Sequence, residues 1–338
     1  MRAALVGYGP AGAGLHAPLI ARTDGLEVAA VVTSDPGRRQ AVARDHPGAE
    51  LLDAADAIWA DPSRFDLVVV AAPNRAHADL AERSLREGLP VVVDKPLAVS
   101  TADADRLVAV AQETGVPLAV FHNRRWDSDF LAVRELAPSI GPLVRLEARW
   151  ERWRPEVQVQ RWRESGAAAE GGGLLWDLGS HMIDQALVLF GPPRSVFAHL
   201  ARVRAGARVD DDTFVQLGYA GGPEVQLWMS LVAVEPGPRF RVTGLGGLLE
   251  SHGLDPQEDR LRGDQAPEVS LRMVTGAGGE QIVPPPAGDW ADFYAGVRDA
   301  LTGGGPMPVT GADGAQVVRV IEAARRSADS GSVVALPG

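Results

Sequence analysis

The segment "ALVGYGPAG", residues 4–12, decides the fold of the N-terminal part of this chain. It sets Gly7, Gly9 and Gly12 in GxGxxG spacing, directly after a short apolar run and before a stretch of helical character. In such a turn the glycines permit a tight bend, close approach of a pyrophosphate and close packing of helix on strand. A merely glycine-rich turn is the alternative, but the position at a first strand–helix junction predicts a dinucleotide site. The expected contacts are Gly7, Gly9, Pro10, Ala11 and Gly12.

The pattern around this turn continues to about residue 121. Short apolar runs such as "LEVAAVV", "FDLVVVAAP", "LPVVVDKP" and "GVPLAVFH" alternate with amphipathic stretches. Runs of Val, Leu and Ala without alternation are typical of strands buried on both faces of a parallel sheet. Helices are expected over 75–87 and 101–114, ending at Gly88 and Gly115. Residues 1–121 are therefore predicted to form a doubly wound α/β domain that binds a dinucleotide.

The pattern changes after residue 122. "GPLVRLEARWER" alternates apolar and charged residues, as expected of a strand with one face in water. "DTFVQLGYAGGPEVQLWMSL" and "PRFRVTGLGGLLESHG" predict two hairpins, and helices are expected over 289–302 and 311–329. Residues 122–338 are thus predicted to form an α+β domain with an open, mostly antiparallel sheet. Because an open sheet must be covered, we expect a homodimer or homotetramer through that face.

Composition excludes several classes of protein. The net charge of -11, with acidic and basic residues interspersed, argues against a nucleic-acid or anionic-membrane surface. The absence of cysteine excludes disulfides and Cys-ligated metal sites. The first apolar run is too short for a signal-peptide core, and the longest later run cannot span a bilayer, so a cytoplasmic protein is expected.

The end of the second predicted strand bears on the choice of cofactor. NAD-binding folds usually place an acid there to hold the adenosine ribose. In "VVTSDPGRR" the tip instead carries Thr33 and Ser34, with Arg38 and Arg39 within the next turn. Small hydroxyls and nearby arginines suit a 2′-phosphate, so we expect NADP in preference to NAD. The alternative is that Asp35 serves the ribose, if the strand ends a few residues later than expected.

A predicted helix over 171–191, "GGGLLWDLGSHMIDQALVLFG", carries the candidate chemistry. At about 100° per residue, Asp177, His181 and Asp184 share one narrow wedge of its surface. An ordinary wet stripe is the alternative. Because the helix is apolar around most of its circumference, it is expected to be buried, and the polar wedge is then expected to face a cleft.

Lys95 is the sole lysine of a chain with 33 basic residues. Lys is a compact cation with a movable pKa, whereas Arg is a rigid fork that stays charged, so a specific need at this position is favoured over chance. Lys95 is expected at the carboxyl end of a strand, where ligands of doubly wound folds bind. There its ammonium would stabilise a developing alkoxide.

A dehydrogenase also needs a base beside the nicotinamide ring, and elimination narrows the choice. A Cys-ligated zinc site is impossible, and none of Tyr8, Tyr219 and Tyr294 stands four residues before Lys95, which excludes a Tyr-x-x-x-Lys pair. His181 remains, with an ordinary pKa that suits general-base work at neutral pH. Asp177, Lys95 and His181 are the predicted catalytic residues, and the mechanism requires no metal.

Further candidates follow the predicted strands. Ala72, Pro73 and Asn74 come just beyond "LVVVAAP", near where a nicotinamide would reach, with a plain loop turn as the alternative. His77 is expected at the start of a helix rather than as a catalyst. These four residues, with Asp94 and Lys95, are assigned to the cofactor side.

Residues after the last parallel strand are candidates on the substrate side. Asn123, Trp126 and Asp127 are expected to line the cleft between the domains; for Asp127 the alternative is a helix start, where a carboxylate favours the dipole. Trp162 offers an aromatic face to a sugar ring, although packing on the sheet is the more common role. With Lys95, Asp177, His181 and Asp184, they form the predicted substrate site. Several carboxylates beside one lysine suit a neutral polyol better than an acidic substrate.

The segments "GYGPAG", "AAPNRAH", "DKP" and "GGGLLWDLGSHMIDQ" together resemble the glucose-fructose oxidoreductase, inositol dehydrogenase and rhizopine-catabolism (Gfo/Idh/MocA) family. The resemblance covers nearly the whole chain. It implies a Rossmann domain followed by an α+β domain, NAD(P), and a sugar or cyclitol substrate. The family's Glu-Lys-Pro motif appears as Asp94, Lys95 and Pro96, a departure at the acid only, and its catalytic Lys, Asp and His match Lys95, Asp177 and His181.

Looser matches, "FHNRRWDSDFLAVREL", "RWRESG", "GLDPQED" and "GDWADFYAGVRDAL", resemble the scyllo-inositol dehydrogenase subgroup, whose members often prefer NADP. The leading hypothesis is an NADP-preferring polyol or sugar dehydrogenase that acts on a scyllo-inositol-like substrate. A reductase of another keto-sugar or carbonyl metabolite, and a dinucleotide-sensing regulator without turnover, are the alternatives.

Overall fold

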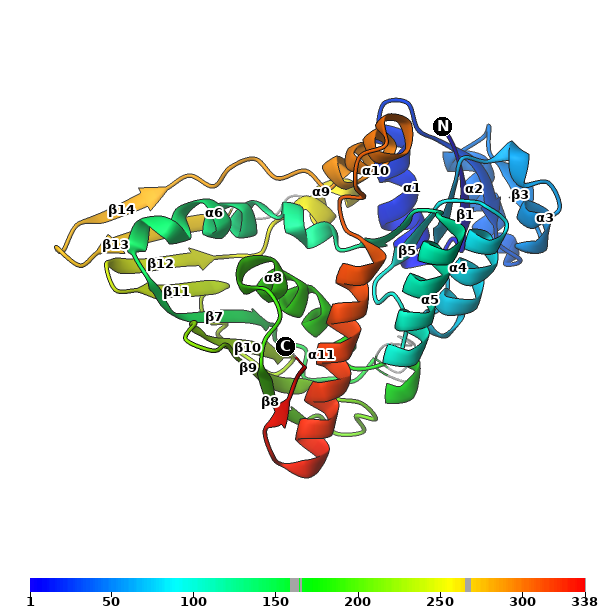
Figure 1. Ribbon diagram of the computed structural model, residues 1–338. Coiled ribbons are helices and arrows are strands. Elements are labelled where there is room, and N and C mark those ends of the chain that lie inside the picture. Colours follow the sequence, from blue (N-terminus) through cyan, green and yellow to red (C-terminus); the bar gives the residue numbers. More distant parts are fainter. Residues whose placement is uncertain (159–163, 165, 265–268, 338) are drawn as a thin grey trace. The chain divides into compact units, whose positions relative to one another are not determined.

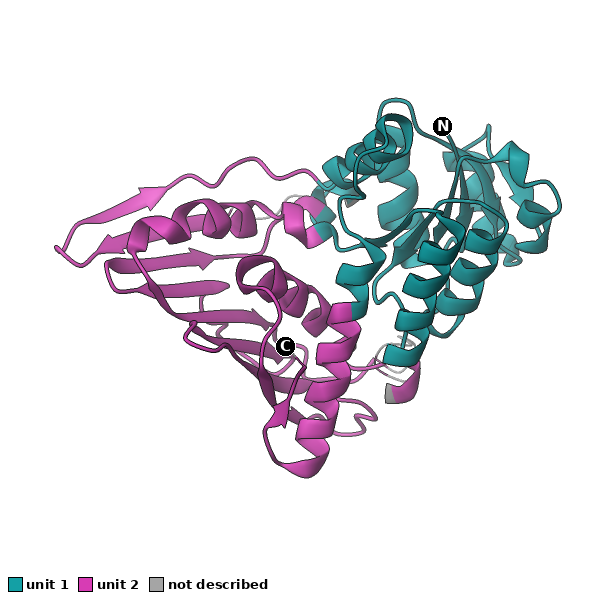
Figure 2. Cartoon of the chain, in the orientation of Figure 1, with its two compact units in different colours: residues 1–123, 258–264, 290–315 teal, residues 124–257, 265–289, 316–338 magenta. Residues whose placement is uncertain are grey.

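A computed structural model of the chain describes residues 1–158, 164, 166–264 and 269–337 (Figure 1). It contains two compact units (Figure 2). Unit 1 comprises residues 1–123, 258–264 and 290–315, and unit 2 comprises residues 124–257, 265–289 and 316–338. The expected boundary near residue 122 lies close to the first junction. The division 1–121 and 122–338 differs from the observed one in that residues 258–264 and 290–315 belong to unit 1.

The return of residues 290–315 to unit 1 has a physical basis in contacts with the first part of the chain. The helix formed by residues 291–303 packs against the helix formed by 17–22. Arg298 donates a hydrogen bond of 2.7 Å to the carbonyl of Asp24, and the amide of Val120 donates to the carbonyl of Val309 at 3.2 Å. These contacts join residues far apart in the sequence, which a local pattern does not reveal.

Unit 1 is built on a six-stranded parallel sheet with the order β3-β2-β1-β4-β5-β6. This is the doubly wound arrangement that the alternating pattern predicts, and the fold class is confirmed. The core positions of β1, β4, β5 and β6 are almost wholly buried, as expected of strands covered on both faces. The strands are β1 (Arg2–Val6), β2 (Glu27–Val32), β3 (Glu50–Leu52), β4 (Leu67–Val70), β5 (Val91–Asp94) and β6 (Leu118–Phe121).

Helices of unit 1 follow local start and stop signals. The helix expected over 101–114 is observed over those residues, with Ser100 accepting a hydrogen bond from the amide of Asp103 at the N-terminus and Gly115 in the left-handed region after the C-terminus. The helix formed by residues 77–86 packs beside it and against β4 and β5. The helices are η1 (Gly12–His16), α1 (Ala17–Arg22), α2 (Pro36–Asp45), α3 (Asp56–Trp59), η2 (Pro62–Arg64), η3 (Asn74–Ala76), α4 (His77–Arg86), α5 (Thr101–Thr114) and α10 (Ala291–Gly303).

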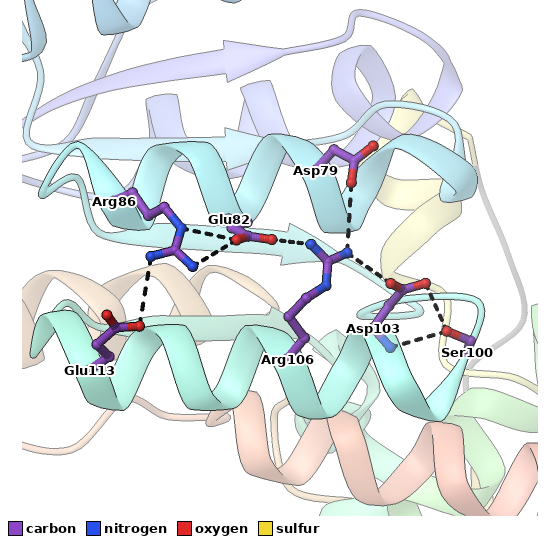
Figure 3. A network of polar contacts seen from close by, with 7 residues as sticks. All are labelled: Asp79, Glu82, Arg86, Ser100, Asp103, Arg106 and Glu113. Carbon is purple, nitrogen blue, oxygen red and sulfur yellow. Dashed lines mark hydrogen bonds and ion pairs between the residues drawn. The ribbon is translucent and has the colours of Figure 1, made fainter.

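An ionic network joins the exposed faces of α4 and α5, which lie side by side (Figure 3). Arg106 on α5 pairs with Glu82 on α4 and with Asp103, the latter at 2.8 Å. Arg86 pairs with Glu82 at 2.9 Å and with Glu113 at 3.7 Å. The network lies on a water-facing surface, so each pair contributes little to stability.

Unit 2 is built on a nine-stranded sheet with the order β14-β13-β12-β11-β7-β10-β9-β8-β15. All its neighbouring strands are antiparallel except β7 and β10, which run parallel, so the expected open, mostly antiparallel sheet is confirmed. The strands are β7 (Leu143–Glu151), β8 (Ser195–Ala201), β9 (Asp212–Gly218), β10 (Glu224–Ser230), β11 (Phe240–Gly244), β12 (Gly247–His252), β13 (Ser270–Thr275), β14 (Glu280–Val283) and β15 (Val334–Ala335).

One face of this sheet carries helices. The helix formed by residues 128–136 packs on β11 and β12, and the helix formed by residues 180–190 packs on β10. In the helix formed by residues 311–330, the hydroxyl of Ser327 accepts a hydrogen bond from the amide of Ala198 in β8. The helices that involve unit 2 are η4 (Asn123–Trp126), α6 (Ser128–Leu136), η5 (Ala137–Ile140), η6 (Ala168–Glu170), η7 (Leu175–Gly179), α8 (Ser180–Phe190) and α11 (Gly311–Ser330); α9 (Gln257–Arg262) begins at its border with unit 1. No helix in the described part of the chain is long and apolar enough to span a membrane.

Candidate active site

The glycine turn after β1 has the geometry of a dinucleotide site. Gly7 has a φ of 101°, and a Cβ there would lie 2.5 Å from the carbonyl oxygen of Ala71. A Cβ on Gly12 would collide with the carbonyl of Gly7, whereas a Cβ on Gly9 would meet no heavy atom within 4 Å. Gly7 and Gly12 thus permit the tight bend and close packing, and the space beside Gly9 is open to a ligand. The turn fits a bound pyrophosphate.

Pro10 and Ala11 form the start of the helix that follows the turn. The first helical hydrogen bond runs from the amide of Ala13 to the carbonyl of Gly9 at 2.8 Å. The amides at this end therefore precede the hydrogen-bonded ladder and point where an anion would bind. The helix widens at once into the π-helical turn η1, which ends at His16.

The tip of β2 is the part of unit 1 on which the expected choice between NADP and NAD depends. Asp35 caps α2 by accepting a hydrogen bond of 2.8 Å from the amide of Arg38. Arg39 donates to the carbonyl of Thr33 at 3.1 Å and pairs with Asp53 at 2.7 Å, while Ser34 is exposed. Asp35 thus has a structural role at the helix start, and two arginines stand within one turn of the tip.

The loop after β4 contains the residues expected near the nicotinamide. Ala72 is half-buried, Pro73 exposed and Asn74 buried. His77 is the first residue of α4, as expected, and it is fully buried. Its ring nitrogens lie 2.8 Å from the carbonyl oxygens of Ala72 and Pro96, so it bridges the loops that follow β4 and β5.

Lys95 directly follows β5, at the carboxyl end of the parallel sheet. It is 9% exposed, and its amide donates a hydrogen bond of 2.9 Å to the side chain of Asp94. Burial alone would raise the pKa of Asp94, but His16 outweighs it, with smaller contributions from Lys95 and His77, and lowers that pKa to about 2. Asp94 is therefore a buried carboxylate that stays ionised at neutral pH. The expected placement of Lys95 at a strand end is observed.

In unit 2, Asp177 and His181 lie on the helix expected over 171–191. That helix begins with the π-helical turn η7 and continues as α8, so regular α-helical spacing does not hold across Asp177. His181 is 7% exposed, and its ring lies 6.1 Å from that of Trp150 with an interplanar angle of 29°. Trp150 is thus a packing surface for the imidazole.

Asp210 anchors the start of the helix that carries Asp177 and His181. Its carboxylate accepts hydrogen bonds from the amide of Leu175 at 2.8 Å and the hydroxyl of Thr213 at 3.0 Å. Burial raises the pKa of Asp210, and these hydrogen bonds oppose the rise. Gly173 has a φ of 102°, and any Cβ there would collide with the Asp210 carboxylate. The segment "VDDDTF" therefore serves to fix the helix start.

Two neighbouring residues hold the middle of α8 against the segment that follows β6. Arg125 binds both carboxylate oxygens of Asp184, at 2.9 and 2.7 Å. Gln185 donates to the carbonyl of Arg124 at 3.0 Å and accepts from Arg239 at 2.9 Å. Both carboxylate oxygens of Asp184 are thus engaged by an arginine, and the expected contact of Asp184 with substrate stays a prediction.

The other substrate-side candidates lie in the segment after β6. Asn123 is buried, Trp126 is half-buried, and the carbonyl of Trp126 accepts a hydrogen bond of 2.9 Å from Gln257. Asp127 stands at the start of α6 and pairs with Arg124 at 3.1 Å. Trp162 lies outside the described residues.

These pairings also correct the charge argument. Asp127 and Asp184, which the sequence counts as carboxylates facing substrate, are neutralised by Arg124 and Arg125. The charge of the site therefore does not exclude an acidic substrate.

The sequence analysis does not identify several residues that position the site. Gln185 lies within residues 171–191, and the signal for it is a polar residue in an otherwise apolar helix. His16 and Tyr294 form a hydrogen bond of 2.6 Å across 278 residues, which no local pattern indicates. In the described residues, no group of three side chains of metal-ligating type comes together.

Two family models match the chain. The model described as "Oxidoreductase family, NAD-binding Rossmann fold" matches residues 1–122, and the model described as "Oxidoreductase family, C-terminal alpha/beta domain" matches residues 137–336. Both are models of the Gfo/Idh/MocA family, which the sequence resembles.

Curated relatives and solved structures agree with this match. The chain is 38% identical over 341 residues to an uncharacterized oxidoreductase, YdgJ, of Escherichia coli, covering 97% of this chain and 96% of the relative. It is 33% identical over 342 residues to the scyllo-inositol 2-dehydrogenase (NADP(+)) IolW of Bacillus subtilis, covering 97% and 93%. A crystal structure of a putative oxidoreductase from Klebsiella pneumoniae matches with a TM-score of 0.90 and 37% identity, over 100% of this chain and 95% of that one.

Proposed function

The chain belongs to the Gfo/Idh/MocA family of oxidoreductases, and from this premise we propose that it is an NADP-preferring dehydrogenase of a sugar or cyclitol. It interconverts a secondary alcohol and a ketone on a scyllo-inositol-like substrate. The observation that carries the proposal is the place of Lys95, the sole lysine, at the carboxyl end of β5 in an NAD-binding fold. The relative from Bacillus subtilis supports the substrate class.

Three side chains take part in the proposed reaction, each with its own role. Oxidation of the carbinol removes a hydride from carbon and a proton from oxygen, and leaves a ketone; the nicotinamide, when bound, supplies the hydride acceptor. His181 takes the hydroxyl proton as general base. The Lys95 ammonium donates a hydrogen bond to the same oxygen as negative charge develops there. Asp177 holds the imidazole or a neighbouring hydroxyl of the substrate.

Unit 1 supplies the residues that would hold the cofactor. The glycine turn and the helix start at Pro10 and Ala11 would hold the pyrophosphate, and residues of the loop after β4 would contact the nicotinamide. At the tip of β2, Arg38 and Arg39 bind the 2′-phosphate, since Asp35 is engaged in capping α2. We expect Arg39→Ala to raise the KM for NADP about 10-fold and to change the KM for NAD little, because a phosphate–guanidinium contact is lost. A clear preference of the wild type for NAD would contradict this assignment.

The proposed activity is tested by following reduced nicotinamide with NADP or NAD and a panel of cyclitols, sugars and polyols at alkaline pH. We expect oxidation of at least one cyclitol, and a loss of about 100-fold or more in turnover for His181→Asn with unchanged cofactor affinity. Activity on keto-sugars alone would favour the alternative reductase. Cofactor binding without turnover across the whole panel would favour a dinucleotide sensor.

We further propose that a second copy of the chain covers the open face of the unit 2 sheet. On β7 that face carries the alternating charges of Arg145, Glu147 and Arg149, and Phe214 packs against the partly exposed ring of Trp228 at 4.4 Å. Alternating charges beside an aromatic pair are complementary to a symmetry-related copy of the same surface. Light scattering is expected to show a dimer or tetramer that Trp228→Glu dissociates; a monomeric wild type would contradict the proposal.

A further inference from the structure

A buried chain of polar contacts in unit 1 ends at the backbone of Lys95. The hydroxyl of Tyr294, on α10, lies 2.6 Å from Nδ1 of His16, and Nε2 of His16 lies 3.6 Å from the Asp94 carboxylate. The same carboxylate accepts the amide of Lys95 at 2.9 Å. His16 and Tyr294 are fully buried, so the contacts act without competition from water.

The imidazole of His16 lies between a phenol and a carboxylate. Burial, and then the nearby charge of Asp94, raises the pKa of Tyr294 well above its ordinary value, so the phenol keeps its proton. Nδ1 of His16 faces this phenol and Nε2 faces the Asp94 carboxylate, so the imidazole stands between the two groups. The ring is held in this orientation by Phe121, whose centroid lies 4.4 Å away.

The place of His16 connects two parts of the cofactor domain. His16 is the last residue of η1, the π-helical turn that begins at Gly12 of the glycine turn. A π-helical turn inside a longer helix is often found at functional sites. The carbonyl of Pro96 on the far side of Lys95 is held by His77 at 2.8 Å. Buried imidazoles therefore lie on both sides of Lys95: His77 contacts the carbonyl of Pro96, and His16 faces the carboxylate that accepts the Lys95 amide.

We propose that His16 is a positioning residue: with Tyr294 behind it, it holds the Asp94 carboxylate in place, and through that carboxylate it fixes the backbone from which the Lys95 ammonium reaches the reacting oxygen. The catalytic part of this inference rests on the proposed function, and the structural part stands without it. Small errors in the placement of a catalytic group cost up to about 100-fold in rate. A chain that touches neither substrate nor cofactor can therefore control turnover.

The sole lysine provides a direct probe of the structural part. Protein labelled with heavy-nitrogen lysine gives a single backbone amide signal in its nitrogen–proton correlation spectrum, and that signal is the Lys95 N–H bound to Asp94. His16→Leu removes both polar contacts. His16→Gln places an amide nitrogen near the position of Nε2 and can still donate to Asp94, whereas His16→Asn reaches only toward Tyr294. Ser84→Ala is the matched control, since Ser84 is a buried polar residue of the same unit that accepts from Trp59 instead.

We expect the Lys95 signal to shift, and its hydrogen exchange to accelerate at least about 10-fold, in His16→Leu and His16→Asn, but not in His16→Gln or Ser84→Ala. With the substrate found in the panel assay, kcat falls about 10- to 100-fold in the first two variants and recovers in His16→Gln, while the dissociation constant for NADPH stays within about twofold of wild type. Thermal unfolding confirms that each variant is folded.

The possible failures are distinguishable. A folded His16→Leu protein with an unchanged Lys95 signal and unchanged exchange would overturn the positioning role, whatever the enzyme does. Equal behaviour of His16→Asn and His16→Gln would also overturn it, because only one of them reaches Asp94. A wild type with an intact Lys95 signal but no turnover on any substrate would instead overturn the proposed function.

Discussion

The ionic network on α4 and α5 and the polar contacts beneath Lys95 differ in their exposure to water, and the more exposed region has the larger number of contacts. On α4 and α5, Arg106 reaches three carboxylates, and its side chain is 41% exposed (Figure 3). Beneath Lys95, His16 makes one hydrogen bond to Tyr294 and one contact of 3.6 Å with the Asp94 carboxylate, and its side chain is fully buried. Exposed pairs exchange with water at little cost, whereas a buried polar group that loses its partner has no replacement. The smaller set of contacts is therefore expected to matter more, both for stability and for turnover.

The largest effect is expected at the end of the buried chain. Lys95→Arg keeps a positive charge but replaces a compact ammonium by a planar fork, which does not reproduce the same contact with an alkoxide. We expect kcat to fall about 1,000-fold, with cofactor affinity and thermal stability close to wild type. Steady-state kinetics and cofactor titration measure this. Near-normal turnover would show that charge alone suffices and that the sole lysine is accidental.

A second prediction concerns the charge of Asp94. Its pKa is lowered to about 2 in the folded protein, so its contribution to stability is present above the pKa of an unfolded Asp and is lost as pH falls toward about 2. Asp94→Asn keeps an acceptor for the Lys95 amide and removes the charge. At neutral pH the wild type should be more stable by about 2 kcal/mol, and the difference should shrink by about 1 kcal/mol by about pH 3.

Denaturant unfolding of both proteins across that pH range measures the difference. A gap that stays constant with pH would mean that the carboxylate is not held ionised in the folded state.

Tyr294→Phe should have a smaller effect. It removes the hydroxyl that faces Nδ1 of His16 and leaves the His16–Asp94 contact in place. Loss of one buried hydrogen bond is expected to cost about 1 kcal/mol of stability, and kcat should fall less than in His16→Leu. Urea unfolding and steady-state kinetics test this. A larger loss of turnover than in His16→Leu would reverse the proposed order of the chain.

The smallest effect is expected on the exposed surface. Arg106→Ala removes the centre of the network between α4 and α5, yet the unfolding free energy should change by less than about 1 kcal/mol. Because salt screens exposed pairs, the difference should vanish at about 1 M NaCl, while that of Tyr294→Phe should persist. Turnover should be unchanged. If Arg106→Ala lowered the unfolding free energy more than Tyr294→Phe does, the expected difference between the exposed and the buried region would be wrong.

The parts of this molecule that the sequence predicts depend on local signals. Gly7, Gly9 and Gly12 act within one turn, and the helix from Thr101 to Thr114 is bounded by a capping serine and a left-handed glycine. The residues that determine each of these features lie within a few positions of one another, so the features can be predicted from the sequence. The strand that leads to Lys95 is predictable for the same reason.

Other features depend on residues far apart. The π-helical turn that carries Asp177 breaks the regular spacing on which the predicted wedge relied. Arg125, 59 residues away, engages Asp184, and His16 meets Tyr294 across 278 residues. Such pairs form only when the chain is folded, and single-residue chemistry does not distinguish an aspartate that binds substrate from one that binds arginine. No local sequence pattern therefore predicts which residues take these positioning roles.

The central claim is that the Lys95 ammonium and the His181 imidazole act on one oxygen of a carbinol beside the nicotinamide. The most direct measurement is a crystal structure of the protein with NADP and a cyclitol that it oxidises. The account predicts that Nζ of Lys95 and a ring nitrogen of His181 both lie within about 3 Å of the same substrate oxygen. A structure in which the two groups contact different parts of the ligand, or in which only one of them reaches it, would contradict the account.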